Sequence, residues 1–326
     1  MERLPFDPGI NDVAKAYKFL RTRVRHTPTE YSYILSEIAG APVYLKLENQ
    51  QMCGSFKVRG ALNKMFSLTE EERAKGVITC SSGNHGQGMA IAAKKLKVKT
   101  KIFVPDDCPD TKMKAMQNIG GEFIEIIKVD GDYNTAEKDS RKYAADNKIT
   151  YVSSFEDPLV IAGQGTVGFE MMTDEPDIEV VLVPAGGGGL LNGVGIAAKA
   201  INPKVEVWGV ESVASNPFAI SWKSGIVKEP DFKESIAEGL FGSIPQSLLT
   251  IAKENADGII EVTEEEIMRG IAFMLREQRQ IIEGAGIVGI SAVLAGKAPI
   301  KGRKTGIVVS GGNIDNAKLM KILAEN

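Results

Sequence analysis

The sequence is short of cysteine and of aromatic residues, and each shortage narrows the class of protein. Its three cysteines, Cys53, Cys80 and Cys108, lie in unrelated contexts, without the spacing of a zinc site or of a disulfide framework. Aromatic residues make up 6% of the chain and hydrophobic residues 43%, so an aliphatic core is expected. These features are typical of a globular protein in a reducing compartment.

Neither an excess of positive charge nor a long apolar run is present. The 39 basic and 42 acidic residues are spread along the chain, so no basic face is expected for nucleic acid or anionic lipid. No segment offers the roughly 18 uninterrupted apolar residues of a membrane span, and residues 1–7 have no basic start with an apolar run after it. We expect a cytoplasmic protein that binds neither nucleic acid nor membrane.

The chain has 326 residues, which suits two domains or one large domain with a smaller one inserted. Short β-branched runs alternate with helical patterns, and this alternation predicts parallel sheets with crossover helices. The runs are 43–47, 76–81, 101–105, 122–127, 151–154, 179–184, 206–210 and 306–310. Capping boxes at 69–72 and 263–266 predict two helix starts. Domain borders are expected near Ser67 and Ser153.

Glycine is concentrated in one place, at Gly186, Gly187, Gly188 and Gly189. This tetrad follows the apolar run 180–183 and precedes a helical pattern that starts near Leu190. Unhindered backbone N–H groups and a helix dipole then meet at one point, which suits a phosphate group. The alternative is a tight strand-to-helix turn. Four glycines in a row lose much backbone entropy on folding, which favours the phosphate.

Three further segments hold candidate functional residues. Lys57 lies among small and apolar residues in 54–61, where a desolvated amine could attack an aldehyde; the alternative is a solvated surface lysine. In 81–88, backbone N–H groups could hold a carboxylate; the alternative is a polar N-cap cluster with a structural histidine. Segment 308–313 ends a strand with a hydroxyl and two glycines, at a place where open sheets bind ligands, or else forms a turn.

These four segments, in this order, resemble the fold-type II enzymes that use pyridoxal 5'-phosphate (PLP), the tryptophan synthase β-like group. Among them, the chain is most similar to threonine (serine) dehydratases and serine racemases, and segments 162–166 and 283–286 fit the same pattern. The resemblance implies two open, twisted, mostly parallel sheets with helices on both faces. It also implies a large PLP-binding domain of 1–67 and 152–326, a small domain of 68–151, and a cofactor in the cleft between them.

The resemblance further assigns roles to residues. Lys57 carries the cofactor as a Schiff base and, with Ser82, is catalytic. The cofactor contacts are Phe56, Lys57, Asn84, Gly186, Gly187, Gly188, Gly189, Leu190, Glu283, Ser310 and Gly311. The substrate carboxylate lies against Ser81, Ser82, Gly83, Asn84 and His85.

The implied reaction is β-elimination of threonine or serine to a 2-oxo acid and ammonia. Ser310 would face the pyridine nitrogen, and a neutral hydroxyl makes the ring a weaker electron sink, which suits elimination. Ser82 keeps serine racemisation open, because racemases of this group have a serine there. Ser153 replaces a histidine of the dehydratase pattern and keeps other substrates, such as 3-hydroxyaspartate, open. Two alternatives come from other functional classes. The protein could be a nucleotide- or phosphosugar-binding enzyme, or a non-catalytic regulatory protein.

A second cofactor candidate is a divalent or monovalent cation. The family's cation site resembles Glu211 together with a backbone carbonyl near Ser215, although Pro217 stands where racemases supply an aspartate. The alternative for Glu211 is a rim glutamate at the end of a strand. The expected partners are a small hydroxy-amino-acid substrate and further copies of the chain, in a dimer or tetramer.

Overall fold

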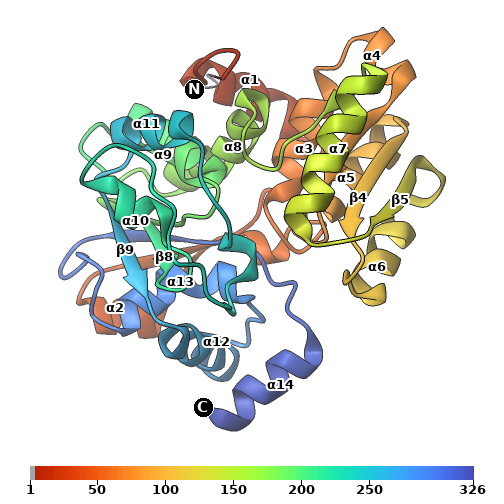
Figure 1. Cartoon of the computed structure of the whole chain (residues 1–326). Coiled ribbons are helices and arrows are strands. Elements are labelled where there is room, and N and C mark those ends of the chain that lie inside the picture. The colour runs from red at the N-terminus through yellow and green to blue at the C-terminus, as the bar shows by residue number, and fades with distance from the viewer. Residues whose placement is uncertain (1–3) are drawn as a thin grey trace.

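Two β-sheets form the framework of the computed structural model, which describes residues 4–326 (Figure 1). The first three residues, part of the expected large domain, lie outside the described residues. The larger sheet has the order β1-β2-β10-β7-β8-β9 and the smaller β5-β4-β3-β6. β1 is antiparallel to β2, and the other neighbouring strands are parallel. The strands are β1 (Thr29–Tyr31), β2 (Val43–Leu47), β3 (Val77–Cys80), β4 (Thr100–Pro105), β5 (Ile124–Val129), β6 (Thr150–Tyr151), β7 (Val180–Pro184), β8 (Glu206–Ser212), β9 (Gly258–Val262) and β10 (Thr305–Val309).

Helices cover both faces of both sheets. In the larger sheet α13 packs along β7 to β10 and α9 lies on β7 and β8; in the smaller sheet α5 and α6 pack on β5, and α7 contacts β3 to β6. The helices are α1 (Ile10–Leu20), α2 (Tyr33–Ala39), α3 (Lys57–Phe66), α4 (Glu70–Lys75), α5 (Asn84–Leu96), α6 (Asp110–Gly120), α7 (Tyr133–Asn147), α8 (Pro158–Asp174), α9 (Gly189–Ile201), α10 (Pro217–Trp222), α11 (Gln246–Asn255), α12 (Glu264–Gln278), α13 (Gly284–Leu294) and α14 (Asn316–Glu325). Three 3-10 turns are η1 (Glu48–Gln50), η2 (Gly121–Phe123) and η3 (Glu238–Leu240). The fold class expected from the sequence is confirmed.

Burial on both faces explains why the central strands are continuous apolar runs. In β7, Val180 and Leu182 join the hydrophobic cluster beneath α12 and α13, whereas Val181 and Val183 join the cluster beneath α9 and α11. Alternate side chains of a strand point to opposite faces, so a strand between two helical layers must be apolar throughout. No helix within residues 4–326 is long and apolar enough to cross a membrane.

Most predicted strands appear within one or two residues of their places, and both capping boxes form. The run predicted at 122–127 begins as a strand only at Ile124, because Gly121–Phe123 closes a 3-10 turn first. The run at 151–154 contributes only Tyr151, which ends the two-residue strand β6. The sequence did not predict β1 and β9, the two edge strands of the larger sheet.

The parallel arrangement brings the carboxyl ends of neighbouring strands to one side. β2, β10 and β7 are adjacent, and each is followed by a segment with candidate functional residues: Lys57 after β2, Ser310 after β10, and the glycine tetrad after β7. β3 in the smaller sheet leads directly into Ser81 and α5. Open α/β sheets bind ligands at such an edge.

Candidate active site

Hydrogen bonds and a β-bridge connect three of the four candidate segments. The N–H of Phe56 donates to the Ser310 carbonyl at 3.1 Å, and Ser55 forms a β-bridge with Gly311. The Asn313 amide donates to Oδ1 of Asn84 at 2.7 Å. Segments that follow β2, β3 and β10 therefore meet at a single place.

Lys57 is the first residue of α3 and lies partly buried in this place. Its Nζ donates to the carbonyl of Ser154 at 3.1 Å. Burial lowers the pKa of the Lys57 amine to about 8, although the Glu283 carboxylate raises it. An amine with this pKa is partly uncharged near neutral pH, so it can act as a nucleophile or as a base.

Glu283 and Asn84 face each other across the site. Nδ2 of Asn84 donates to Oε1 of Glu283 at 2.6 Å, which leaves the second N–H of this amide for a ligand. Burial raises the pKa of the Glu283 carboxyl to about 7, although the Asn84 hydrogen bond lowers it. Ser310 is buried, and its hydroxyl donates to the carbonyl of Ala285 over a long distance of 3.4 Å.

In the loop from Ser81 to Gly83, the N–H of Ser81 donates to the Phe103 carbonyl at 3.0 Å, which leaves the N–H of Ser82 open to a ligand. Oγ of Ser81 accepts from the N–H groups of Gly83 and Gly86, at 3.2 and 3.0 Å, so this hydroxyl shapes the loop. Gly83 caps α5 without a side chain, which leaves N–H groups of the first turn open to an anion. Ser82 is partly buried, and no hydrogen bond joins its hydroxyl to another described residue.

His85 points away from this loop into the small-sheet core. It is 3% exposed, and Nε2 lies 3.1 Å from Oγ1 of Thr79. Burial, followed by the nearby charge of Lys57, lowers the pKa of His85 to about 3, so the ring is neutral. A contribution of His85 to a substrate carboxylate is thus limited to its backbone.

The glycine tetrad lies between β7 and α9 and leaves no room for side chains. A Cβ on Gly187 would lie 2.5 Å from Cγ of Phe155, and one on Gly189 would lie 3.0 Å from the Cα of the same residue. Gly188 caps α9 with φ of +96°, a left-handed conformation that favours glycine. Leu190 is buried in the first turn of α9.

Glu211 and Ser215 lie at the end of β8, apart from these contacts. The Glu211 carboxyl accepts from the N–H groups of Phe218 and Ala219, at 3.1 and 2.9 Å, in the first turn of α10. Burial raises its pKa to about 8, although these two N–H groups lower it. In the described part of the chain, no group of three or more His, Cys, Asp and Glu residues is arranged to hold a metal.

Comparison with known proteins decides the family. The family model described as "Pyridoxal-phosphate dependent enzyme" matches residues 20–311. The chain belongs to this family of pyridoxal-phosphate dependent enzymes.

Family members with different activities are similar to this protein over nearly its whole length. The L-threonine ammonia-lyase of Thermotoga maritima is 42% identical, over 96% of this chain and 78% of the relative. The L-threo-3-hydroxyaspartate ammonia-lyase of Saccharomyces cerevisiae is 34% identical, over 97% of both chains. The solved structure of maize serine racemase superposes with a TM-score of 0.91 at 29% identity and covers 98% of both chains.

The residues of the site suit this cofactor. The glycine loop offers a close backbone approach and an uncapped helix N-terminus, as a phosphate group requires. At the far end of the site, Ser310 and the spare N–H of Asn84 can serve a ring nitrogen and a ring hydroxyl. Lys57 provides an amine with a lowered pKa.

Two residues that shape the site were not among the candidates from the sequence. Phe155 packs against the glycine loop, and Asn313 joins Asn84 to the segment after β10. Asn313 ends the Ser-Gly-Gly-Asn motif, so its position after the strand was a usable signal. Nothing local in the sequence indicates the contact of Phe155 with a loop more than thirty residues away.

Proposed function

We propose that the chain is an ammonia-lyase that eliminates the β-hydroxyl of L-threonine or L-serine and releases a 2-oxo acid and ammonia. The observation that carries the proposal is the partly buried Lys57 amine, which donates to the carbonyl of Ser154 and senses the charge of Glu283, the carboxyl that Asn84 contacts. The identity of 42% to an L-threonine ammonia-lyase supports the substrate class.

In this proposal the cofactor lies against the segments after β2, β7 and β10. Lys57 binds it covalently, and the backbone from Gly186 to Leu190 holds its phosphate. Phe56, Asn84, Glu283, Ser310 and Gly311 surround its ring. When bound, it withdraws electron density from the substrate's α-carbon.

The chain's own groups carry the proton transfers. Released from the cofactor, the Lys57 amine takes the α-proton, because its pKa allows it to be uncharged near neutral pH. The N–H groups of 81–85 hold the substrate carboxylate at the start of α5. The Ser82 hydroxyl, which has no hydrogen-bond partner in the described residues, is the second proton donor in this proposal.

We also propose the arrangement of the whole molecule. Residues 1–67 and 152–326 form a large domain and 68–151 a small one, with the active site between them. Lys57 and Ser154 are large-domain residues that flank the inserted segment, and their hydrogen bond supports this division. The enzyme works as a homo-oligomer in the cytoplasm, and its three free, buried cysteines suit a reducing compartment.

Release of 2-oxo acid tests the function. Purified protein loaded with PLP is offered L-threonine, L-serine and L-threo-3-hydroxyaspartate, and the 2-oxo acid and ammonia are measured together. Equal amounts of both products from threonine or serine support the proposal. Turnover of 3-hydroxyaspartate alone would instead move the substrate class to dicarboxylic amino acids.

Serine racemisation is the second candidate, favoured by the unpartnered Ser82 hydroxyl and by the similarity to maize serine racemase. Recovered serine is analysed on a chiral column in the same experiment. D-serine formed from L-serine, without matching ammonia, would favour this alternative.

We further propose a cation near Glu211 and the Ser215 carbonyl. The Glu211 carboxyl is buried without a cationic partner among residues 4–326, and Glu261 adds negative charge nearby. A cation would supply the missing charge. Stabilisation of wild type by Mg²⁺ or Ca²⁺ during thermal unfolding, and its loss in Glu211→Gln, is the expected result. Equal melting curves with and without either ion would refute it.

A further inference from the structure

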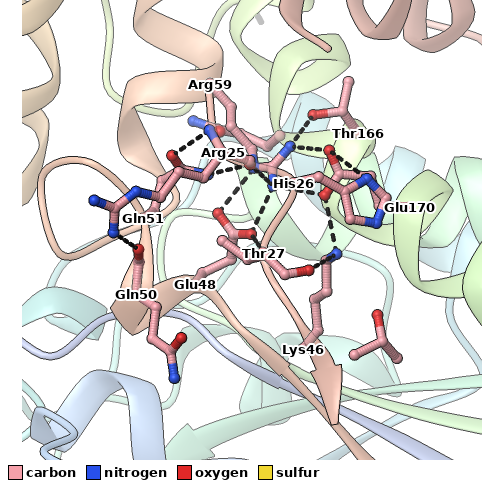
Figure 2. Close-up of polar contacts among 12 residues, drawn as sticks. Arg25, His26, Thr27, Lys46, Glu48, Gln50, Gln51, Arg59, Thr166 and Glu170 are labelled. Carbon is pink, nitrogen blue, oxygen red and sulfur yellow. Dashed lines mark hydrogen bonds and ion pairs between the residues drawn. The ribbon is translucent and has the colours of Figure 1, made fainter. Parts of the chain in front are cut away.

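A group of buried charges surrounds Arg59, which follows Lys57 by two residues on α3 (Figure 2). Lys46, Glu48, Arg59 and Glu170 form it, and none is more than 1% exposed. We call these four residues the buried charge cluster. Two positive and two negative side chains make it neutral. Residues two positions apart point to nearly opposite sides of a helix, so Arg59 and Lys57 project in different directions from the first turn of α3.

Arg59 uses all five of its N–H groups. Nε and one Nη donate to the Glu48 carboxylate at 2.8 and 2.7 Å, and both Nη atoms donate to Glu170 at 2.8 Å each. Further contacts reach Oγ1 of Thr166 at 3.1 Å and the carbonyl of Arg25 at 3.3 Å. A planar guanidinium between two carboxylates has one orientation only, which a lysine cannot reproduce.

The two carboxylates are themselves held in place. Nζ of Lys46 donates to Glu170 at 2.9 Å and to the Thr27 carbonyl at 2.7 Å, and the Thr27 hydroxyl donates to Glu48 at 2.5 Å. Burial alone would lower the pKa of Arg59, but the two glutamates outweigh it and the pKa is raised. The Arg59 guanidinium therefore stays charged, and hydrogen bonds fix the orientation of both carboxylates.

The cluster connects the start of α3 to two other parts of the fold. Glu48 directly follows β2, and β2 pairs with β10, the strand that ends before Ser310. Glu170 lies on α8, which begins shortly after Ser154, the residue whose carbonyl accepts from Lys57. Arg59 thus links the first turn of α3, which bears Lys57, to the segment after β2 and to α8.

We propose that Arg59 is a positioning residue for Lys57, acting through Glu48 and Glu170. The inference rests on the proposed catalytic role of Lys57. If the cluster is lost, α3 stays packed on α5 and α8, but its first turn is free to shift and the amine moves away from Ser154. A mutation far from the reacting atoms that shifts a catalytic group by about 1 Å can lower the rate about 100-fold.

A charge-balanced double variant separates positioning from folding. In Arg59→Met with Glu170→Gln, Lys46 and Glu48 remain and their charges cancel. Replacing buried ion pairs by groups of similar volume is often neutral for stability, so this variant should fold. We expect kcat to fall about 100-fold. We expect KM to change little, because the loop that starts at Ser81 lies outside the cluster.

A readout independent of turnover is the ionisation of Lys57 itself. In the cofactor-free chain, acetylation of each lysine is followed against pH by mass spectrometry of its peptide. In the double variant the Lys57 midpoint should rise towards that of an ordinary lysine, because a displaced amine regains water. This readout separates the two ideas: if wild type shows no lyase activity, the midpoint still tests positioning.

Two further variants complete the test. Arg59→Lys keeps the charge but not the two-carboxylate geometry, so kcat and the Lys57 midpoint should shift in the same directions. Asp257→Asn is the control: Asp257 accepts from Lys199 and from the N–H of Val207, at the end of α9 remote from the glycine loop. It should lower stability and leave kcat and the midpoint unchanged.

Wild-type kcat and an unchanged Lys57 midpoint in the folded double variant would overturn the proposal. If the double variant does not fold, Arg59→Lys decides in the same way. A loss of stability in Arg59→Lys with both readouts unchanged would make Arg59 structural only.

Discussion

Two basic residues on the first turn of α3 have opposite surroundings. Lys57 makes one hydrogen bond, to a carbonyl, and burial lowers its pKa to about 8. Arg59, two residues later, lies between two buried carboxylates, and its pKa is raised. Burial without an ion pair makes a side chain reactive, and burial between two paired carboxylates makes it rigid. The enzyme places the first kind of site directly beside the second.

The largest effect is expected from removal of the reactive side chain. Lys57→Ala should lower kcat by at least about 1000-fold, because covalent attachment and the general base are lost together. Cofactor-free stability should not fall, since Arg59 and its partners remain. Steady-state kinetics with L-threonine and L-serine measure this. Activity within tenfold of wild type would rule out the assigned role.

Replacing Lys57 or Arg59 by methionine should change the free energy of unfolding in opposite directions. Arg59→Met leaves Glu48 and Glu170 with one counter-charge and should cost about 3–5 kcal/mol. Lys57→Met removes an amine whose pKa is lowered from 10.5 to about 8, and should stabilise the cofactor-free chain by up to about 3 kcal/mol at pH 7. Denaturant unfolding at pH 7 measures both, and the same sign for both variants would contradict the comparison.

The stability gained in Lys57→Met should depend on pH, because it arises from the lowered pKa of the Lys57 amine. Below pH 8 the folded and unfolded chains both hold the lysine proton, so the wild type bears the full cost of a buried charge. Between pH 8 and 10.5 the folded chain releases the proton first, and wild-type stability rises. The advantage of Lys57→Met should therefore shrink over this interval. A gain that grows with pH would contradict the assignment.

A smaller effect is expected from the carboxyl that faces Lys57. Glu283 raises the pKa of the amine, so Glu283→Gln should lower the Lys57 acetylation midpoint, by up to about one unit. Asn84 can still donate to the new amide oxygen, which preserves the geometry. A midpoint that rises or stays constant would show that the two groups do not interact.

The smallest effect on elimination is expected from Ser82. Elimination needs a base on one side of the substrate only, so Ser82→Ala should keep most 2-oxo acid release. Any racemisation of serine should disappear, because inversion needs a second proton donor. Chiral analysis together with the 2-oxo acid assay measures both. Equal loss of the two activities, with cofactor still bound, would place the hydroxyl in the elimination pathway itself.

The sequence predicted those parts of the molecule that local patterns determine. Apolar runs gave the central strands, and Lys57, Asn84 and Gly189 each lie at the start of a helix, as the motifs suggested. The two edge strands of the larger sheet were missed, because β1 has three residues and alternate residues of β9 are only partly buried.

Contacts between distant residues could not be predicted. The side chain of Asn84 is oriented by Glu283, nearly two hundred residues later, and the ring of His85 turns towards Thr79 and the core. The partners of Arg59 lie at Glu48 and Glu170, which share no motif with it. Their charges show no periodicity: Glu170 reaches Arg59 because α3 packs against α8, and Glu48 reaches it from the turn after β2.

Identification of the lysine that binds the cofactor tests the central claim most directly. Wild-type protein loaded with PLP is reduced with borohydride and digested, and the labelled peptide is sequenced by mass spectrometry. The adduct should lie on Lys57, whose amine combines burial with a pKa of about 8. An adduct on any other lysine, or an unlabelled Lys57 in an active preparation, would contradict the account.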